Sequence, residues 1–497
     1  MSLKSLLALP FAIKVKKGID KWAVNPIETQ NRVFQDLIST AAATEFGKDH
    51  NFVSINSHDD FVKHVPVRDY EQLKPYVNKV VAGEPDILWP KKPLYFAKTS
   101  GTTSGAKYIP ITKESMPTHI ANARNAIMCY IAETKNTKFV DGKMIFLQGS
   151  PVLTEQNGIN LGRLSGIVAH FVPKYLLKNR LPSWETNCIE DWETKVNAIV
   201  EETVSENMSI ISGIPSWVQM YFEKLVEKTN KPIGELFKNF NLFIYGGVNY
   251  EPYRNKFENL IGRKVDSIEL YPASEGFFAF QDSQKEKGML LQLNSGIFYE
   301  FIKVTEFSKD NAKRITLKDV EVGVNYVMII STTAGLWAYN IGDTVQFTST
   351  SPYRVIVSGR IKHFISAFGE HVIGKEVEQA LQEAIQGTDV RINEFTVAPQ
   401  ITPENGLPYH EWFIEFENEP DDMDVFSNTI DLALQKQNTY YFDLIDGKVL
   451  RPLIVTKIVT NGFKDYMKSI GKLGGQNKLP RLSDNRAIAD KLSKFCI

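Results

Sequence analysis

The stretch Thr99-Ser-Gly-Thr-Thr-Ser-Gly-Ala-Lys107 directly follows a strand that the apolar pattern predicts at 94–97. Its glycines can take positive φ and let the backbone approach a ligand closely. The hydroxyls and backbone N–H groups can donate to phosphate oxygens, and Lys107 adds a positive charge. It is not a Walker P-loop, because Tyr108 follows the lysine where that motif has Ser or Thr. The residues alone leave two interpretations open, a polar surface turn and a phosphate-binding loop.

Strands and helices alternate after this stretch. Such alternation predicts sheets that are covered by helices on both faces. The expected strand and helix pairs are 94–97 with 115–132, 144–147 with 192–202, 209–211 with 217–226 and 242–245 with 253–260, followed by a strand at 267–270.

The regions on either side have a different character. Before residue 94 the chain reads as helical, with Val33, Leu37, Ile38 and Ala41 at the spacing of an amphipathic helix. From about residue 290 it becomes β-rich, and beyond a hinge-like segment at 358–363 helices alternate with strands again. The later strands are expected at 290–293, 298–304, 326–332, 354–357, 395–398 and 412–416, and the later helices at 376–385 and 425–434.

These patterns predict an α/β protein of two domains. The large N-terminal domain, 1–359, is expected to combine helix-covered sheets with a β-rich, barrel-like portion. The small C-terminal α+β domain is expected at 360–497. A chain of 497 residues is too long for one ordinary core, which agrees with this division.

Composition limits the classes of partner. The 57 Lys and Arg residues balance 58 Asp and Glu residues, so no global basic field attracts nucleic acid or an anionic membrane. The three cysteines are scattered and form no CxxC pair, which argues against a disulfide framework and a zinc site and favours a cytoplasmic location. No apolar run approaches the roughly 20 residues that a membrane-spanning helix needs.

Three further segments carry groups suited to nucleotide chemistry. Tyr271-Pro-Ala-Ser-Glu275 ends a predicted strand, where open α/β sheets bind ligands, and offers an aromatic ring and a possible Mg²⁺ carboxylate. Tyr339-Asn-Ile-Gly-Asp343 places an acid after a glycine, suited to ribose hydroxyls. Lys478 lies in a glycine-rich loop near the C-terminus. Considered alone, 271–275 is more commonly a strand end with a solvated Glu. A Gly-Asp pair such as that of 339–343 is usually a turn. A lone lysine such as Lys478 is normally a solvated charge.

Together, in this order and at these separations, the segments resemble those of the ANL adenylate-forming superfamily. They most resemble its Gretchen Hagen branch, the auxin-responsive acyl acid amido synthetases, in the form of a bacterial-type homologue. That branch is marked by SSGTT-type, YxxSE-type and YRxGD-type segments, which read here as 99–103, 271–275 and 339–343. The similarity extends from about Phe34 to Arg481 and includes 65–70 and 213–217.

The resemblance implies an enzyme that uses ATP and Mg²⁺. A carboxylic acid is adenylated with release of pyrophosphate, and the acyl group then passes to the amine of an amino acid with release of AMP. Lys478 and Glu275 are the implied catalytic residues, with Glu275 also holding the metal. The C-terminal domain is implied to be mobile and to carry the lysine loop.

The remaining site residues are expected to hold the nucleotide and the acyl group. The ATP-binding set is Thr99, Ser100, Gly101, Thr102, Thr103, Gly105, Lys107, Gly246, Gly247, Tyr271, Ala273, Ser274, Asp343 and Arg360. The acyl-pocket candidates are Trp217, Phe277 and Phe278, although aromatic residues beside a strand end are more often core. The expected partners are the small carboxylic acid and the amino acid, with no nucleic acid, membrane or obligate protein partner.

Three departures from the family pattern stand out. Thr99 stands where the family often has Ser, a change that keeps the hydroxyl, and Asn340 replaces the usual Arg of the third segment. His363 stands in the hinge-like segment where an acid is frequent. Two alternatives also remain. A ligase that forms a coenzyme A thioester would share the adenylation residues, and a nucleotide-binding homologue could keep the fold without catalysis.

Overall fold

The computed structural model describes residues 3–99, 107–172, 177–247, 250–307, 312–361, 364–365, 370, 372–446, 449–473, 478–483 and 485–497. Two compact units emerge from the contacts of the chain. The first comprises 1–248 and 260–356, and the second comprises 249–259 and 357–497. We describe each unit by itself.

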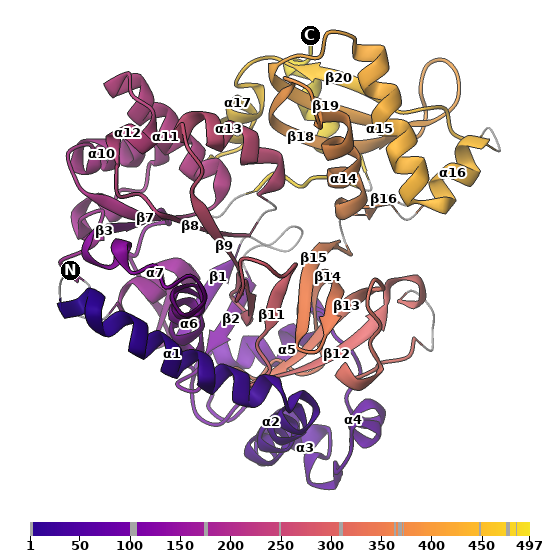
Figure 1. Ribbon diagram of the computed structural model, residues 1–497. Helices are drawn as coiled ribbons and strands as arrows, with labels where there is room; N and C mark the ends of the chain where they lie inside the picture. The colour runs from indigo at the N-terminus through magenta and orange to yellow at the C-terminus, as the bar shows by residue number, and fades with distance from the viewer. Residues whose placement is uncertain are drawn as a thin grey trace. The chain divides into compact units, whose positions relative to one another are not determined.

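The first unit holds the following elements (Figure 1). Its helices are α1 (Leu3–Ala23), α2 (Pro26–Ala41), α3 (Glu45–Asp49), α4 (His58–His64), α5 (Tyr70–Val81), α6 (Met116–Thr134), α7 (Leu164–Ala169), α9 (Trp184–Asn187), α10 (Trp192–Thr203), α11 (Pro215–Thr229) and α12 (Ile233–Leu236). Its strands are β1 (Tyr95–Thr99), β2 (Lys107–Ile111), β3 (Lys143–Phe146), β4 (Thr154–Gln156), β5 (Ile159–Gly162), β6 (Arg180–Leu181), β7 (Met208–Ser212), β8 (Leu242–Gly246), β9 (Asp266–Ala273), β10 (Gly276–Phe280), β11 (Met289–Leu291), β12 (Ile297–Lys303), β13 (Asn325–Thr332), β14 (Tyr339–Thr350) and the first half of β15 (Tyr353–Arg360).

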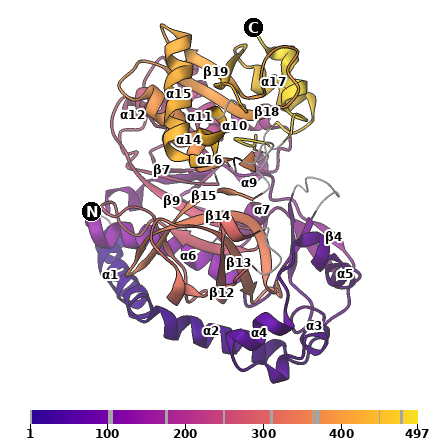
Figure 2. The same cartoon turned by 90° about the vertical axis from the view of Figure 1, so that its right-hand side faces the viewer.

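One large sheet organises this unit. Within the described residues its order is β12-β13-β14-β15-β11-β10-β9-β8-β7-β3-β6, and a separate sheet has the order β2-β1-β5-β4. The strands β6, β3, β7, β8 and β9 pair in parallel. The pairs β9–β10, β10–β11, β11–β15, β12–β13 and β13–β14 are antiparallel. Figures 1 and 2 show α10 and α11 on one side of the parallel strands and α6 with α1 on the other. The expected helix-covered sheet and β-rich portion are therefore confirmed as parts of one sheet.

Burial explains why the local patterns predicted these elements. The apolar stripe of α2 is buried as expected, including Val33, Leu37 and Ile38. On the opposite end of the unit, Ala126 and Cys129 of α6 are buried with Phe277 of β10 in one apolar cluster. Burial of apolar surface stabilises the folded protein by about 25 cal/mol per Å², and this free energy holds helix and sheet together.

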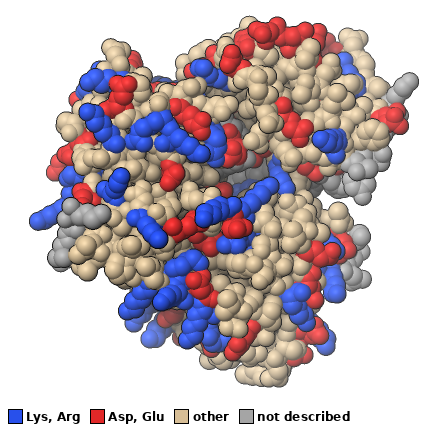
Figure 3. Space-filling model, in the orientation of Figure 1, with Lys and Arg blue, Asp and Glu red and all other residues tan. Residues whose placement is uncertain are grey.

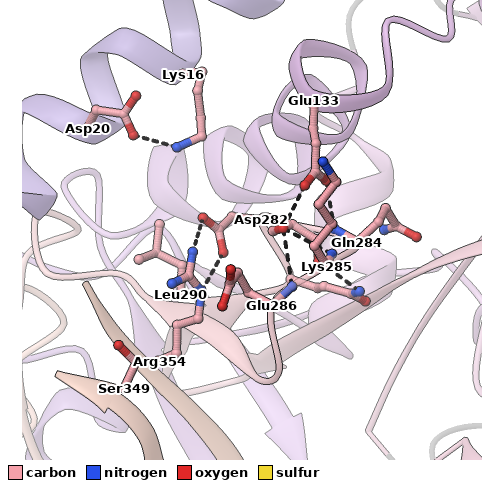
Figure 4. Close-up of polar contacts among 12 residues, drawn as sticks. Lys16, Asp20, Glu133, Asp282, Gln284, Lys285, Glu286, Leu290, Ser349 and Arg354 are labelled. Carbon is pink, nitrogen blue, oxygen red and sulfur yellow. Dashed lines mark hydrogen bonds and ion pairs between the residues drawn. The ribbon is translucent and has the colours of Figure 1, made fainter. Parts of the chain in front are cut away.

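A buried ion pair fastens the β-rich part of the sheet (Figure 4). Arg354 of β15 donates from Nε to Asp282 Oδ1 at 3.1 Å and from Nη2 to Oδ2 at 2.9 Å. Asp282 follows β10, so the pair spans β11, which lies between β10 and β15. Next to it, Glu133 of α6 accepts a hydrogen bond from the backbone N–H of Gln284 at 2.6 Å. The turn after β10 is thus tied to both a strand and a helix.

The second unit is a small α+β body. Its elements are α13 (Glu251–Ile261, up to residue 259), the end of β15, β16 (Phe364–Ile365), β17 (Val372–Ile373), α14 (Gly374–Ile385), β18 (Arg391–Gln400), β19 (Tyr409–Asn418), α15 (Met423–Gln437), α16 (Thr439–Asp446), β20 (Ile454–Ile458), α17 (Gly462–Ser469) and α18 (Ala489–Leu492). A three-stranded sheet, β18-β19-β20, forms its centre. Most of the helix α13, which follows β8 in the chain, belongs to this unit, and its Tyr253 Oη accepts a hydrogen bond from Arg481 at 2.7 Å.

Charge is distributed evenly over the visible surface. Figure 3 shows acidic and basic side chains interspersed over this face, in agreement with the formal net charge of −1. Within the described residues, no helix combines the length and the apolar character that crossing a membrane requires.

Candidate active site

The turn between β9 and β10 carries the segment Tyr271–Glu275. β8 and β9 run parallel, with Gly246 opposite Leu270, so their carboxyl ends lie at the same edge of the sheet. Ala273, Ser274 and Glu275 are half-buried in the turn that follows. The chain therefore places a carboxylate where parallel strands end, which is the usual ligand edge of such sheets.

Asp343 lies on a β-bulge, a feature that the sequence did not predict. β13 and β14 pair Val327 with Thr344 and Ile329 with Asn340, so Met328 alone faces the three residues 341–343. Gly342 has φ +85°, a conformation that glycine tolerates without strain. Bulges bend a strand and redirect its side chains, and they are common beside active sites.

Tyr271 and Asp343 meet directly. The phenol of Tyr271 donates a hydrogen bond to Asp343 Oδ2 at 2.7 Å. The tyrosine is only 7% exposed, and its ring also lies edge-on against Phe278 at 5.0 Å between centroids. Two residues that were selected from separate segments are thus parts of one local arrangement.

A short segment, 65–70, links this arrangement to the strand after the glycine-rich stretch. Arg68 pairs with β14 on both sides: its N–H donates to Ala338 O at 3.1 Å, and its carbonyl accepts from the Asn340 N–H at 2.8 Å. Two residues later, Tyr70 Oη accepts a hydrogen bond from the Tyr108 N–H at 2.8 Å. The ammonium of Lys107 lies 5.4 Å from the centre of the Tyr70 ring.

The stretch 99–107 joins two paired strands. Thr99 ends β1 and is opposite Lys107, the first residue of β2. The expected site residues Ser100, Gly101, Thr102, Thr103 and Gly105 lie outside the described residues, so their role stays a prediction. What the structure describes is the antiparallel pairing of β1 with β2.

The two glycines after the β8 strand differ in their surroundings. A Cβ at Gly246 would lie 2.4 Å from the carbonyl oxygen of Leu270 on β9, so the pairing of the two strands itself requires glycine there. Gly247 has φ +84°, which also favours glycine. Close strand packing accounts for Gly246, while approach of an adenine remains a prediction.

The acyl-pocket candidates do not share one environment. Trp217 of α11 is buried with its ring centre 4.6 Å from that of Trp192 on α10. Phe277 belongs to the apolar cluster with α6, whereas Phe278 contacts Tyr271. The acyl pocket therefore stays a prediction, with Phe278 as the candidate that contacts another proposed site residue.

Lys478 and Arg360 belong to the second unit. Both side chains are exposed, and Arg360 is the last residue of β15. The segment 358–360, expected as the start of a hinge, is strand, and His363 lies outside the described residues. The proposed roles of Lys478, Arg360 and the hinge stay predictions.

Glu275 is the carboxylate proposed to bind a metal ion. Among the described residues, no group of three or more His, Cys, Asp or Glu side chains is arranged to hold a metal ion. Mg²⁺, however, commonly takes only one or two protein carboxylates, with water and substrate phosphates completing its shell. A single carboxylate at Glu275 is compatible with that mode of binding.

Sequence analysis missed the supporting residues Arg68, Tyr70 and the amide of Asn340. The Asn340 Oδ1 accepts a hydrogen bond from the Gly342 N–H at 2.9 Å. One local signal marks the first of these segments: Asp69 and Gln72 form a capping box at the start of α5, a D-x-x-Q pattern visible in the sequence. The pairing of Arg68 with β14 has no local signal.

Three family models match most of the chain. The GH3 family N-terminal, central and C-terminal domains match residues 15–184, 290–360 and 375–487. An indole-3-acetic acid-amido synthetase of Arabidopsis thaliana is 22% identical over 99% of this chain and 96% of its own length. A jasmonoyl-L-amino acid synthetase of Oryza sativa subsp. japonica is 21% identical over 91% of both chains.

Solved structures show the same fold. An acyl acid amido synthetase in complex with 2,4-DB superposes with a TM-score of 0.79 at 17% identity, covering 97% of this chain and 96% of that one. A 2-hydroxyisobutyryl-CoA ligase superposes with a TM-score of 0.61 at 14% identity, covering 94% of this chain and 92% of that one.

Proposed function

Because this chain belongs to the GH3 (Gretchen Hagen) family of the adenylate-forming enzymes, we propose that it is an ATP-dependent acyl acid amido synthetase. The observation that carries the proposal is the ordered match of all three GH3 domains along one chain. The contact between Tyr271 and Asp343 supports it, because it unites two segments that the family uses for the nucleotide.

In the first half-reaction, a carboxylate oxygen of the acid attacks the α-phosphorus of ATP, and the bond to pyrophosphate breaks. Both reactants are anionic, so the site must offset their repulsion. We assign Lys107 and the stretch 99–107 to the phosphates, Tyr271 and Asp343 to the nucleoside, and Glu275 to Mg²⁺. The metal, when bound, supplies positive charge against the phosphate oxygens.

In the second half-reaction, the nitrogen of an amino acid attacks the acyl carbon, AMP leaves and the amine loses a proton. The proposal takes the amino acid as acceptor from the names of the relatives, which are amido synthetases. The CoA ligase neighbour supports the shared fold alone. We also propose that Lys478 acts in the adenylation step. The large domain is proposed to end near residue 359. The protein is proposed to be cytoplasmic.

A screen of pyrophosphate release tests the function. Carboxylic acids are incubated with magnesium-ATP in three series: without acceptor, with an amino-acid mixture and with coenzyme A. The expected result is acid-dependent pyrophosphate release, with an amide and AMP found by mass spectrometry only in the amino-acid series. A thioester in the third series would make the protein a CoA ligase, and a nucleotide bound without turnover of any acid would support a non-catalytic homologue.

A further inference from the structure

Asn340 is the second residue of the segment 339–343, and the structure gives it a specific contact. Its side-chain Oδ1 accepts a hydrogen bond from the N–H of Gly342, two residues ahead, at 2.9 Å. The contact lies inside the bulge of β14, in which residues 341–343 face Met328 alone. Asn340 therefore closes the bulge that ends in Asp343.

The flanks of the bulge are held independently of this side chain. The Asn340 N–H donates to Arg68 O at 2.8 Å, and the Arg68 N–H donates to Ala338 O at 3.1 Å. Beyond the bulge, regular pairing resumes at Thr344, opposite Val327. The backbone is thus fixed on both sides, and the amide of Asn340 holds Gly342 between them.

The conformation of the bulge decides where Asp343 points. The bulge shifts the register of β14 by two residues, from Asn340 opposite Ile329 to Thr344 opposite Val327, so regular pairing would move Asp343 along β13 to the position opposite Tyr326. In the bulged form, the carboxylate of Asp343 reaches Tyr271 at 2.7 Å. Without an acceptor for the Gly342 N–H, the bulge loses a hydrogen bond that favours this form over regular pairing.

We propose that Asn340 is a positioning residue for the nucleotide: it fixes the bulge so that Asp343 is presented, together with Tyr271, to the ribose hydroxyls. This inference rests on the proposed function, which assigns Asp343 to the ribose. Asn340 does not touch the nucleotide in this arrangement. It fixes the conformation of the segment 339–343 by accepting a hydrogen bond from the backbone N–H of Gly342.

The test compares nucleotides that differ only in the ribose. Calorimetric titration with magnesium-ATP and magnesium-2′,3′-dideoxy-ATP is carried out on the wild type, Asn340→Leu, Asn340→Asp and the control Asn325→Leu. Asn325 is a matched asparagine on β13, the neighbouring strand, and among the described residues its buried Oδ1 accepts no hydrogen bond. Amide exchange of Gly342 in the free protein serves as a readout that needs no ligand.

Wild type should bind ATP about tenfold more tightly than the dideoxy nucleotide, the effect of a hydrogen bond to a charged acceptor. Asn340→Leu should bring the two affinities within about twofold of each other and speed exchange at Gly342, because the acceptor is lost. Asn340→Asp, which keeps an acceptor oxygen, and Asn325→Leu should both retain the wild-type preference.

Each other outcome has one meaning. If Asn340→Leu keeps the wild-type preference, or if Asn325→Leu loses it equally, the positioning role is wrong. If exchange at Gly342 does not change, the hydrogen bond does not hold the bulge. A wild-type protein that binds neither nucleotide overturns the proposed function itself, whereas binding of ATP with an unaffected Asn340→Leu overturns only this inference.

Discussion

Tyr271 on β9 donates a 2.7 Å hydrogen bond to Asp343 on β14, although β10, β11 and β15 lie between these strands in the sheet. Strands in a flat sheet are about 4.8 Å apart, so four steps would separate β9 from β14 by about 19 Å. Two side chains cannot bridge that distance. The sheet must therefore curl so that the two strands approach across its concave side.

The first prediction concerns this pair. In a double-mutant cycle, Tyr271→Phe and Asp343→Asn should each destabilise the protein, and their effects should be non-additive by about 1–2 kcal/mol, because the hydrogen bond has a charged acceptor. Urea unfolding measures the four variants. Tyr353→Phe is the control for loss of a tyrosine hydroxyl, because the Tyr353 phenol donates to the neutral Leu317 carbonyl at 2.9 Å. Additive effects would show that the contact contributes nothing.

The second prediction concerns Glu275. Glu275→Gln keeps the size of the side chain and removes the charge proposed to hold Mg²⁺, so adenylation should fall about a hundredfold or more. Acid-dependent pyrophosphate release at saturating Mg²⁺ measures the effect, and the melting temperature should stay close to that of wild type. Glu286→Gln, at an exposed carboxylate in the turn after β10, is the control. Normal release by Glu275→Gln would remove this residue from the site.

Gly246 gives a third prediction, which separates packing from ligand contact. Gly246→Ala should destabilise the free protein by about 1–3 kcal/mol, as overpacking does, because the new Cβ would lie 2.4 Å from the Leu270 carbonyl oxygen. Gly18→Ala is the control, since a Cβ there meets nothing within 4 Å. Unfolding without nucleotide is measured. An unchanged stability with weakened ATP binding would instead favour a role at the adenine.

Local patterns predicted much of this fold, for a physical reason. The buried stripe of α2 and the parallel strands β7, β8 and β9 follow from hydrophobic periodicity, which reports burial directly. The selection of Tyr271 and Asp343 as members of one site came from recognisable segments, and their hydrogen bond agrees with it.

Other features have no local signature. Gly342 and Asp343 are typical of a turn, yet they form a bulge within the twelve-residue strand β14, because β13 and Arg68 pair with both flanks. The helix α13 follows β8 in the chain but contacts the second unit through Tyr253 and Arg481, which are 228 residues apart. Such partners are set by tertiary packing, which composition and periodicity do not encode.

The fourth prediction concerns the buried pair of Arg354 and Asp282. Asp282→Ala should destabilise the protein by about 3–5 kcal/mol, because it leaves the Arg354 guanidinium buried without its partner. Urea unfolding measures the loss, with Asp20→Ala as the control, since Asp20, which pairs with Lys16 (Figure 4), is half-exposed whereas Asp282 is buried. The combined variant Asp282→Leu/Arg354→Met should lose much less than Asp282→Ala. Equal effects of Asp282→Ala and Asp20→Ala would contradict the role of burial.

The last prediction concerns pH and His119 of α6. This side chain is 5% exposed, and burial lowers its pKa to about 4 from an ordinary value of 6.5. Its Nδ1 has no hydrogen-bond partner among the described residues, so nothing offsets the cost of a charge there. The unfolded chain binds the proton near pH 6.5, whereas the native protein binds it only near pH 4. Stability must therefore fall as the pH is lowered through this window, by about 3 kcal/mol from this residue alone.

Replacing His119 by leucine should remove that dependence. The free energy of unfolding, measured in urea at several pH values from 7 to 4, should fall less steeply for His119→Leu than for wild type. His64→Leu, at an exposed histidine, is the control for the loss of a histidine side chain. Parallel curves for wild type and His119→Leu would mean that the native protein protonates His119 as readily as the unfolded chain does. The surroundings of the His119 side chain would then have to admit water or a counter-charge that the packing in the structure does not provide.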